Sequence, residues 1–410
     1  MNNNGIENPR SIYLDVSSTA VSPIFTGIPR VVRTIAEHRN LNEVCLIEFD
    51  GITNSYKRIQ ELPPVHMSTE SASRTRRAVL ATKLYKALTE NEIVGNIVTF
   101  ILRNRFIFYV ARRLLGAPSL KGEVLSNLQG TLFLPEVPVH RYHTKKILKL
   151  QQNGLIKVAL YVHDLLPLQH PDFFSSELVR KFESFLELIK AADVILVSNE
   201  DVKNQVERTF NKKDVQVVQL PSAYIQTQPT LEPKSQFLVV GTLEPRKNHI
   251  AILDSFERLH QAYPDIELVI VGNLGWKYTE IVERITTMQN RGVKLRWLKN
   301  LSDKDLQREY QQAIALLYPS HYEGYGLPVV EALSQSTPVI TSNRPAMRLF
   351  ARLGGVSLIN PENPDELFTE MIRMLDADHR NAKAQEIQLD KVPTSWAIFT
   401  EQCFQAIKEV

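Results

Sequence analysis

The chain has 410 residues, of which 43% are hydrophobic and 23% charged, and its formal net charge is only +3. This length favours two domains, and the nearly balanced charge gives no general reason to expect nucleic-acid binding. Cys45 and Cys403 are too few for a disulfide framework or a cysteine-rich zinc site and indicate a reducing compartment. With a polar N-terminus and no long uncharged apolar run, we expect a cytoplasmic protein without a signal peptide or a spanning helix.

The first half of the chain predicts an α/β domain. A strand at 11–16 leads through Thr26-Gly27-Ile28-Pro29 to a helix that starts near Arg30. Further apolar runs predict strands at 131–134, 157–162 and 194–197, and amphipathic stretches predict helices at 141–152 and 177–191.

A basic and apolar insertion interrupts this half at 74–121. It contains ten Lys or Arg residues against two acids, and its segments 93–102 and 106–110 are strongly apolar. One interpretation is an interfacial helix on an anionic membrane. The other is a helical insertion that packs on the first domain with its arginines in solvent. The sequence leaves both open.

The second half alternates regularly between the two kinds of element. Strands are expected at 237–243, 267–271, 293–298, 314–318, 338–341 and 356–359, and helices at 252–263, 278–290, 303–313 and 364–375, with Ser302 as a helix cap. This alternation predicts a parallel sheet with helices on both faces. The polar stretch 221–236 separates the halves, so we expect domains at 1–225 and 226–393.

Two carboxylates, Glu323 and Glu331, lie eight positions apart in the segment PSHYEGYGLPVVEAL at 319–333. Gly324 and Gly326 permit a tight turn and the close approach of a ligand. Pro328 suits the first turn of a helix, which would place Glu331 in or near that turn. Two acids at such a place favour hydrogen bonds from a polyhydroxy ligand over direct phosphate binding.

Ligands of parallel sheets bind beyond the carboxyl ends of the strands, where three further motifs occur. Arg246 and Lys247, in GTLEPRKNH at 241–249, form either a diphosphate clamp or an exposed basic turn. Gly27 lets a phosphate approach a helix start, although an ordinary turn is the simpler interpretation. His163 follows a strand and could contact a sugar hydroxyl or move a proton, although a structural histidine is the simpler interpretation. No metal-binding histidine spacing occurs.

Taken together, these motifs resemble the retaining glycosyltransferases of family 4. The resemblance rests on EGYGLPVVEA, on GTLEPRKN, on VHD and on TGIPR, which occur in the family's order. It implies the GT-B fold, in which two Rossmann-like α/β domains face a central cleft and a C-terminal helix, here 394–410, crosses back to the N-terminal domain.

The resemblance also implies roles for individual residues. Arg246 and Lys247 would hold the donor diphosphate, Glu331 the ribose, and Glu323 the sugar hydroxyls, while His163 would contact the sugar near the reacting carbon. Glu323, His163, Arg246 and Lys247 would be the catalytic residues. The implied donor-binding residues are Gly27, Thr242, Arg246, Lys247, Glu323, Gly324, Tyr325, Gly326, Leu327 and Glu331. No metal or cofactor is implied.

The implied activity is transfer of a hexosyl group, with a mannose-type sugar favoured, from a nucleoside-diphosphate sugar. The acceptor would be a saccharide or lipid-linked saccharide in the synthesis of a surface polysaccharide such as O-antigen or capsule, with possible peripheral membrane contact through 74–121. The alternatives are a nucleotide-sugar epimerase of the same fold and a non-catalytic sugar-nucleotide-binding subunit. Ser336 departs from the family, which usually has glycine there, and Lys299 and Asn300 leave the nucleotide base open.

Overall fold

The computed structural model describes residues 11–20, 27–51, 53–62, 122–125, 127–138, 141–224 and 234–409. The insertion at 74–121 and residues 225–233 of the expected linker lie outside these ranges. The chain divides into two compact units. The first takes in the chain up to Tyr161 together with Ser184–Val194, and the second takes in Val162–Glu183 and Ile195–Val410. The domain boundaries expected from the sequence stay a prediction.

The first sheet has eight strands in the order β4-β3-β2-β1-β5-β6-β7-β8. Its expected strands are present as β1 (Ile12–Asp15), β5 (Gly130–Leu134), β6 (Ile156–Val162) and β7 (Val194–Val197). Four more were not expected, namely β2 (Val44–Asp50), β3 (Ser55–Ile59), β4 (Glu123–Leu125) and β8 (Gln216–Val217). Because β3 pairs antiparallel with β2 and β4, this edge departs from the parallel pattern.

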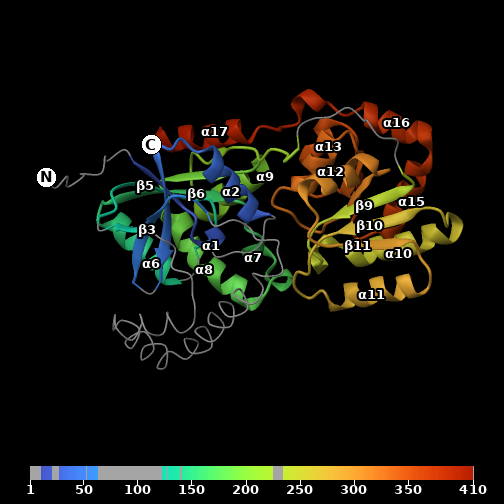
Figure 1. Cartoon of the computed structure of the whole chain (residues 1–410), viewed down its shortest axis with the longest axis horizontal. Helices are drawn as coiled ribbons and strands as arrows, with labels where there is room; N and C mark the ends of the chain where they lie inside the picture. Colours follow the sequence, from blue (N-terminus) through green and yellow to red (C-terminus); the bar gives the residue numbers. More distant parts are fainter. Residues whose placement is uncertain are drawn as a thin grey trace. The chain divides into compact units, whose positions relative to one another are not determined.

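Helices follow β1, β5, β6 and β7 of this sheet (Figure 1). The expected ones are α2 (Ile28–His38), α6 (Arg141–Gln152) and α8 (Ser176–Ala191). The chain also forms α1 (Ser17–Ala20), α7 (Leu166–Gln169), the 3₁₀ turn η1 (Pro171–Phe173) and α9 (Glu200–Phe210). Asn199 caps α9 by accepting a hydrogen bond from the Val202 N–H at 3.0 Å.

The second sheet is parallel in every pairing, with the order β11-β10-β9-β12-β13-β14. All six strands were expected, and they are β9 (Gln236–Val240), β10 (Glu267–Val271), β11 (Leu295–Leu298), β12 (Leu316–Tyr318), β13 (Val339–Ser342) and β14 (Val356–Ile359). The prediction of a parallel α/β sheet is therefore confirmed for this half.

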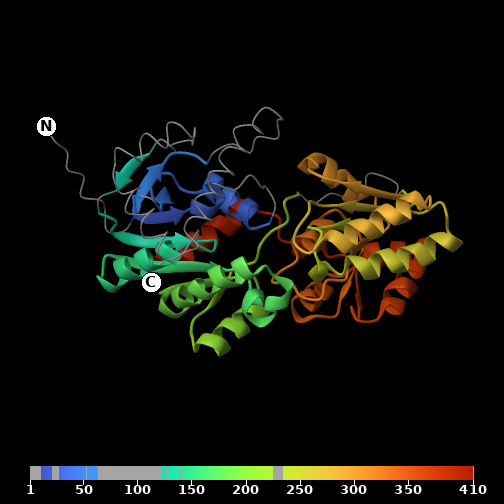
Figure 2. The ribbon, with the colours of Figure 1, turned by 90° about the horizontal axis from the view of Figure 1, so that it is seen from below.

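Its helices cover both faces of the sheet (Figure 1). They include α10 (His249–Ala262), α11 (Thr279–Asn290), α12 (Asp303–Gln312), α13 (Leu327–Ser334) and α15 (Pro364–Leu375). The last helix of the chain is α17 (Trp396–Lys408). Shorter or unexpected elements are η2 (Pro245–Lys247), α14 (Pro345–Arg348), η3 (Leu349–Leu353), α16 (Ala377–Gln385) and η4 (Leu389–Lys391). Helices α10 and α11 are neighbours, as the yellow ribbon in Figure 2 shows. The expected cap of α12 is present, because Ser302 accepts a hydrogen bond from the Asp305 N–H.

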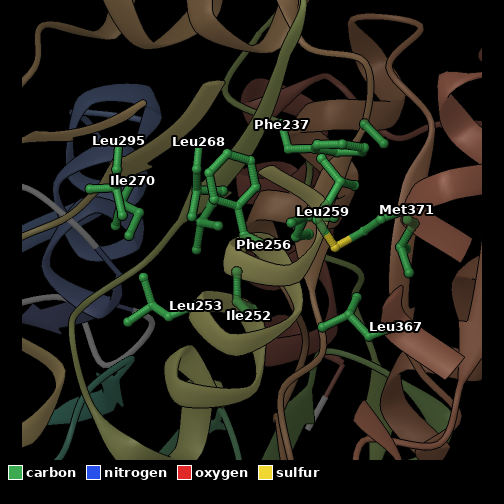
Figure 3. Packing of buried hydrophobic residues seen from close by; sticks show 14 of the residues in the cluster. Phe237, Ile252, Leu253, Phe256, Leu259, Leu268, Ile270, Leu295, Leu367 and Met371 are labelled. Atoms are coloured by element: carbon green, nitrogen blue, oxygen red, sulfur yellow. The ribbon is translucent and has the colours of Figure 1, made fainter. Parts of the chain in front are cut away.

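Side chains of β9 alternate between two buried clusters. Phe237 and Val239 belong to the cluster that α10 and α15 complete, whereas Leu238 and Val240 belong to the cluster on the other face. Figure 3 shows the first cluster, in which Phe256 lies among side chains of the sheet and of neighbouring helices. Burial on both faces fixes the register of the strand, and with it the point at which the loop after β9 begins.

Phe256 provides a test of this core. Its side chain is fully buried, so Phe256→Ala should leave a cavity and lower the free energy of unfolding by about 3–5 kcal/mol. Urea unfolding of the full chain measures the change. Tyr263→Ala is the control, at a position just after the same helix that is 42% exposed. It should shift the midpoint of urea unfolding much less. Equal shifts would contradict the placement of Phe256 in the core.

Candidate functional site

Two loops meet at the carboxyl edge of the second sheet. One joins β9 to α10 and contains Arg246 and Lys247, and the other joins β12 to α13 and contains Glu323. Because β9 and β12 are hydrogen-bonded neighbours that run in the same direction, their carboxyl ends lie side by side. The sheet thus brings together residues that are 76 and 77 positions apart in the sequence.

The centre of the site is an ion cluster. The Nη1 of Arg246 lies 2.7 Å from Oε2 of Glu323, and the Nζ of Lys247 lies 2.6 Å from Oε1 of the same carboxylate. All three side chains are largely buried, with 8–12% of their surface exposed. Glu323 therefore holds both cations at once, one on each oxygen.

Neighbouring groups complete the hydrogen bonding of the two cations. Arg246 donates from Nη2 to Glu244 at 2.6 Å and from Nη1 to the Tyr322 carbonyl at 2.6 Å. Lys247 donates to the Tyr318 hydroxyl at 2.5 Å, and that hydroxyl lies 2.9 Å from Glu323. Sequence reasoning missed Glu244, which lies within the 241–249 motif, and Tyr318, which directly precedes the 319–333 segment, because a short spacing does not indicate which way a side chain points.

The ion cluster determines the charge of Glu323. Burial alone would raise the pKa of this carboxyl, but the opposite charges of Arg246 and Lys247 outweigh burial and hold the pKa at about 2. For Glu244, burial is the larger effect and raises the pKa, against the opposing influence of Arg246. Burial likewise lowers the pKa of Lys247, although Glu323 opposes the shift. Glu323 is thus a fixed negative charge between two cations.

Gly324 allows the loop to lie against the segment that follows β6. A Cβ at this position would lie 2.5 Å from the His163 carbonyl and 2.7 Å from Cβ of Asp164, so only glycine fits here without a shift. His163 is half-buried beside the loop. Burial raises the pKa of Asp164, although the Leu166 N–H and Arg246 oppose the shift. Asp164 was not among the expected site residues.

Two further contacts fix the same loop. The Asn199 side-chain amide donates to the Gly324 carbonyl at 2.6 Å, and the Tyr325 hydroxyl donates to the Leu220 carbonyl at 2.7 Å. Gly326 has φ +109°, and a Cβ there would meet Met347 at 2.7 Å. The tight turn expected from the two glycines is thus present, and Leu327 begins the following helix.

Glu331 lies close to the start of α13, as expected. It is the fifth residue of the helix, directly after the first turn, and is 4% exposed; the helix begins at Leu327, one residue before Pro328. The Tyr310 hydroxyl donates to its Oε2 at 2.8 Å. This helix ends before Ser336, which has φ +59°. That left-handed conformation is the one glycine adopts most easily, which explains why glycine suits the position.

The remaining expected residues have simpler surroundings. Thr242 packs against Gly275, where a Cβ would meet its Cγ2 at 2.7 Å. Gly27 precedes α2 with φ +62° and ψ −134° and makes no side-chain cap, and it belongs to the other compact unit. The structure thus brings Arg246, Lys247 and Glu323 into direct contact, with His163 beside the same loop.

An aromatic stack borders the cluster. The ring of His170 lies on the ring of Tyr322 with centroids 3.6 Å apart, and Phe173 lies 5.9 Å from the same tyrosine. The indole of Trp276 donates to the Phe173 carbonyl, and Lys277 donates to the Asp172 carbonyl at 2.7 Å. These contacts join the α7–η1 segment to loops at the carboxyl edge of the second sheet.

The described part of the chain contains no group of three or more His, Cys, Asp or Glu side chains that could hold a metal ion. That the protein needs no metal stays a prediction. In the same ranges, no helix is long and apolar enough to span a membrane.

Comparison with known sequences identifies the family of the second half. Residues 223–388 match the family model described as glycosyl transferases group 1. The serotype-specific mannosyltransferase WbdA of Escherichia coli is 32% identical over 215 residues, which is 47% of this chain and 26% of WbdA. The O-antigen chain mannosyltransferase B of E. coli is 27% identical over 267 residues, 60% of this chain and 68% of that protein. The chain thus spans only about a quarter of the length of WbdA.

Solved structures agree with the fold. The sucrose-phosphate synthase of Thermosynechococcus elongatus has a TM-score of 0.61 at 15% identity and covers 98% of both chains. Anabaena HepE, in complex with UDP and glucose, has a TM-score of 0.62 at 12% identity, with 98% of this chain and 100% of HepE covered. The expected fold class and family are therefore confirmed: residues 223–388 belong to the group 1 glycosyltransferases, within a chain of GT-B fold that has two Rossmann-like α/β sheets.

Proposed function

We propose that the protein is a retaining glycosyltransferase that moves a hexosyl group from a nucleoside-diphosphate sugar to a saccharide or lipid-linked saccharide acceptor. The observation that carries this proposal is the cluster of Arg246, Lys247 and Glu323 at the carboxyl edge of the second sheet. It combines two cations suited to a diphosphate with a carboxylate suited to sugar hydroxyls.

The reaction explains why fixed cations are needed. Glycosyl transfer develops positive charge on the sugar and negative charge on the departing diphosphate. Arg246 offers a planar fork of donors and Lys247 a point charge, and both are already held in place by Glu323. Cations placed in advance at the leaving group stabilise the transition state more than the ground state.

The carboxylates grip the donor in this proposal and do not act as a glycosidase pair. Glu323, ionised at neutral pH because of its low pKa, accepts hydrogen bonds from sugar hydroxyls, with help from the backbone of 324–327. Glu331 holds the ribose beside Tyr310. With retention, the acceptor attacks the face that the diphosphate leaves, and a phosphate oxygen accepts the acceptor's proton, so no protein nucleophile is required.

His163 and Gly27 have supporting roles in the proposed reaction. His163 contacts the sugar near the reacting carbon, since its backbone already lies at Gly324 against the loop between β12 and α13, residues 319–326, which is the donor loop of this proposal. The backbone of Gly27, at the start of α2, passes close to the phosphates. No metal ion takes part, because cationic side chains neutralise the leaving group.

A mannose-type donor and a surface-polysaccharide acceptor are supported by relatives. Two similar proteins of E. coli are a serotype-specific mannosyltransferase and an O-antigen chain mannosyltransferase. A cytoplasmic protein with peripheral membrane contact through 74–121 would meet a lipid-linked acceptor at the membrane surface.

Arg246 can be tested through turnover. With GDP-mannose and a lipid-linked saccharide, the full chain should release GDP, and Arg246→Ala should lower kcat/KM by about 100-fold because a preorganised donor to the leaving group is lost. Measuring GDP and the extended saccharide together separates transfer from epimerisation, which would yield a rearranged nucleotide sugar.

Two variants serve as controls for this measurement. Arg258→Ala removes an arginine whose side chain is 49% exposed and pairs with Asp365, and its turnover should match that of the wild type. Arg246→Lys retains the charge without the planar fork and should lie between wild type and alanine. Wild-type turnover in Arg246→Ala, with the protein folded, would remove Arg246 from the leaving-group site.

The ionised state of Glu323 predicts a pH dependence of stability. Its folded-state pKa of about 2 lies below the ordinary 4.5, so its stabilisation is fully present above about pH 4.5 and is lost as the pH falls towards 2. Glu323→Gln should therefore melt well below the wild type at pH 7, and the difference should narrow between pH 5 and pH 3.

Melting temperatures across this pH range provide the measurement. Glu362→Gln is the matched control, because Glu362 also pairs with an arginine, Arg344, but its side chain is 58% exposed. The melting temperature of Glu362→Gln should therefore lie close to that of the wild type at every pH. A constant gap between Glu323→Gln and the wild type from pH 7 to pH 3 would contradict the low pKa.

A further inference from the structure

A cavity lies beside the donor loop, in the same compact unit as the ion cluster. Its volume is about 360 Å³, which is near the lower end of the usual range of about 300–1,000 Å³ for small-molecule sites. Side chains that line it include Asn199, Gln219, Tyr325, Phe350, Arg352 and Lys391. Neither Arg246, Lys247 nor Glu323 is part of this lining.

Arg352 and Lys391 give the cavity a positive charge. No carboxylate is among its lining residues. Both are exposed residues, and within the described ranges neither forms an ion pair or a side-chain hydrogen bond. Two cations that reach one cavity without a counter-charge favour an anionic ligand.

The walls indicate what accompanies the anion. Tyr325 and Phe350 meet edge to face with ring centroids 5.3 Å apart, and Phe350 is 5% exposed. An aromatic wall suits the apolar face of a compact ring such as a sugar, and the exposed amide of Gln219 can both donate to and accept from a hydroxyl. The cavity therefore combines cations, a ring surface and an amide.

Two lining residues also hold the donor loop. Tyr325 donates its hydroxyl to the Leu220 carbonyl at 2.7 Å, and Asn199 donates to the Gly324 carbonyl at 2.6 Å. Gly324 directly follows Glu323, which binds Arg246 and Lys247. A molecule in the cavity would therefore contact the same side chains that fix the backbone beside the ion cluster.

We propose that this cavity is a second ligand site, which binds a phosphorylated compound of monosaccharide size through Arg352 and Lys391 and thereby stabilises the donor loop. The site goes beyond the proposed transfer reaction and does not depend on it, because it uses other cations. Its phosphate lies between Arg352 and Lys391, and its ring lies on the wall formed by Tyr325 and Phe350.

Calorimetric titration of the full chain tests the site, with glucose 6-phosphate as the probe and glucose as its uncharged counterpart. Glucose 6-phosphate should bind, and glucose should bind at least about tenfold more weakly, which is about 1.4 kcal/mol. The double variant Arg352→Ala, Lys391→Ala should raise the Kd for glucose 6-phosphate by about tenfold or more. An unchanged Kd in this variant, or no binding to the wild type, would overturn the proposal.

Two further variants locate the binding. Lys304→Ala removes an exposed lysine of α12 that makes no ion pair among the described residues and does not line the cavity, so its Kd should match the wild type. Lys247→Ala damages the donor site, and glucose 6-phosphate should still bind this variant, with a Kd that changes far less than in the double variant. If Lys247→Ala abolishes glucose 6-phosphate binding while the double variant still binds it, the phosphate binds at the donor site. That result would refute the second ligand site.

The connection to the donor loop has its own measurement. Saturating glucose 6-phosphate should lower the Kd of the wild type for GDP. By thermodynamic reciprocity, GDP should lower the Kd for glucose 6-phosphate by the same factor. The double variant should lose this effect while still binding GDP. Identical GDP affinities with and without glucose 6-phosphate would overturn the stabilisation of the loop. Failure of GDP to bind at all would instead count against the donor site.

Discussion

The candidate site depends on one carboxylate that lies between two cations. Without Glu323, the adjacent charges of Arg246 and Lys247 would repel each other in a largely buried place, where an unpaired charge is very unfavourable. With it, each cation has a partner within 2.7 Å. The ion cluster is therefore assembled by the fold itself, before any ligand contributes a charge.

The parallel sheet makes this assembly possible. Alternate side chains of β9 are buried in different clusters on its two faces, so the strand cannot slip by one residue without exposing apolar groups. The register fixes where β9 ends, and the same argument applies to its neighbour β12, whose three residues are all buried. Two loops that start at fixed points of one sheet edge can then place an arginine, a lysine and a glutamate within hydrogen-bonding distance.

The sequence predicted the six strands and the main helices of this half and singled out Arg246, Lys247 and Glu323, because periodicity and motif spacing are local properties. It did not predict that Tyr318 and Glu244 bind the cations, since the direction of a side chain depends on packing across the sheet. The sequence also did not predict β2 and β3. These two strands pair antiparallel with each other, and neither contains a strong motif. The helix of Glu331 begins one residue earlier than expected, at Leu327, because proline does not fix the first residue of a helix to within one position.

The arrangement of charges has a consequence for donor recognition. The two cations face two ionised or ionisable carboxyls, Glu323 and Glu244, so their positive charge is largely balanced within the protein. A diphosphate that binds Arg246 and Lys247 competes with the carboxylates for their N–H donors. The buried oxygens of Glu323 are then left with fewer hydrogen bonds. Sugar hydroxyls of the same donor can supply the missing hydrogen bonds. In the proposed reaction, phosphate and sugar recognition are therefore linked through Glu323, and a donor that carries both groups satisfies the site better than either group alone.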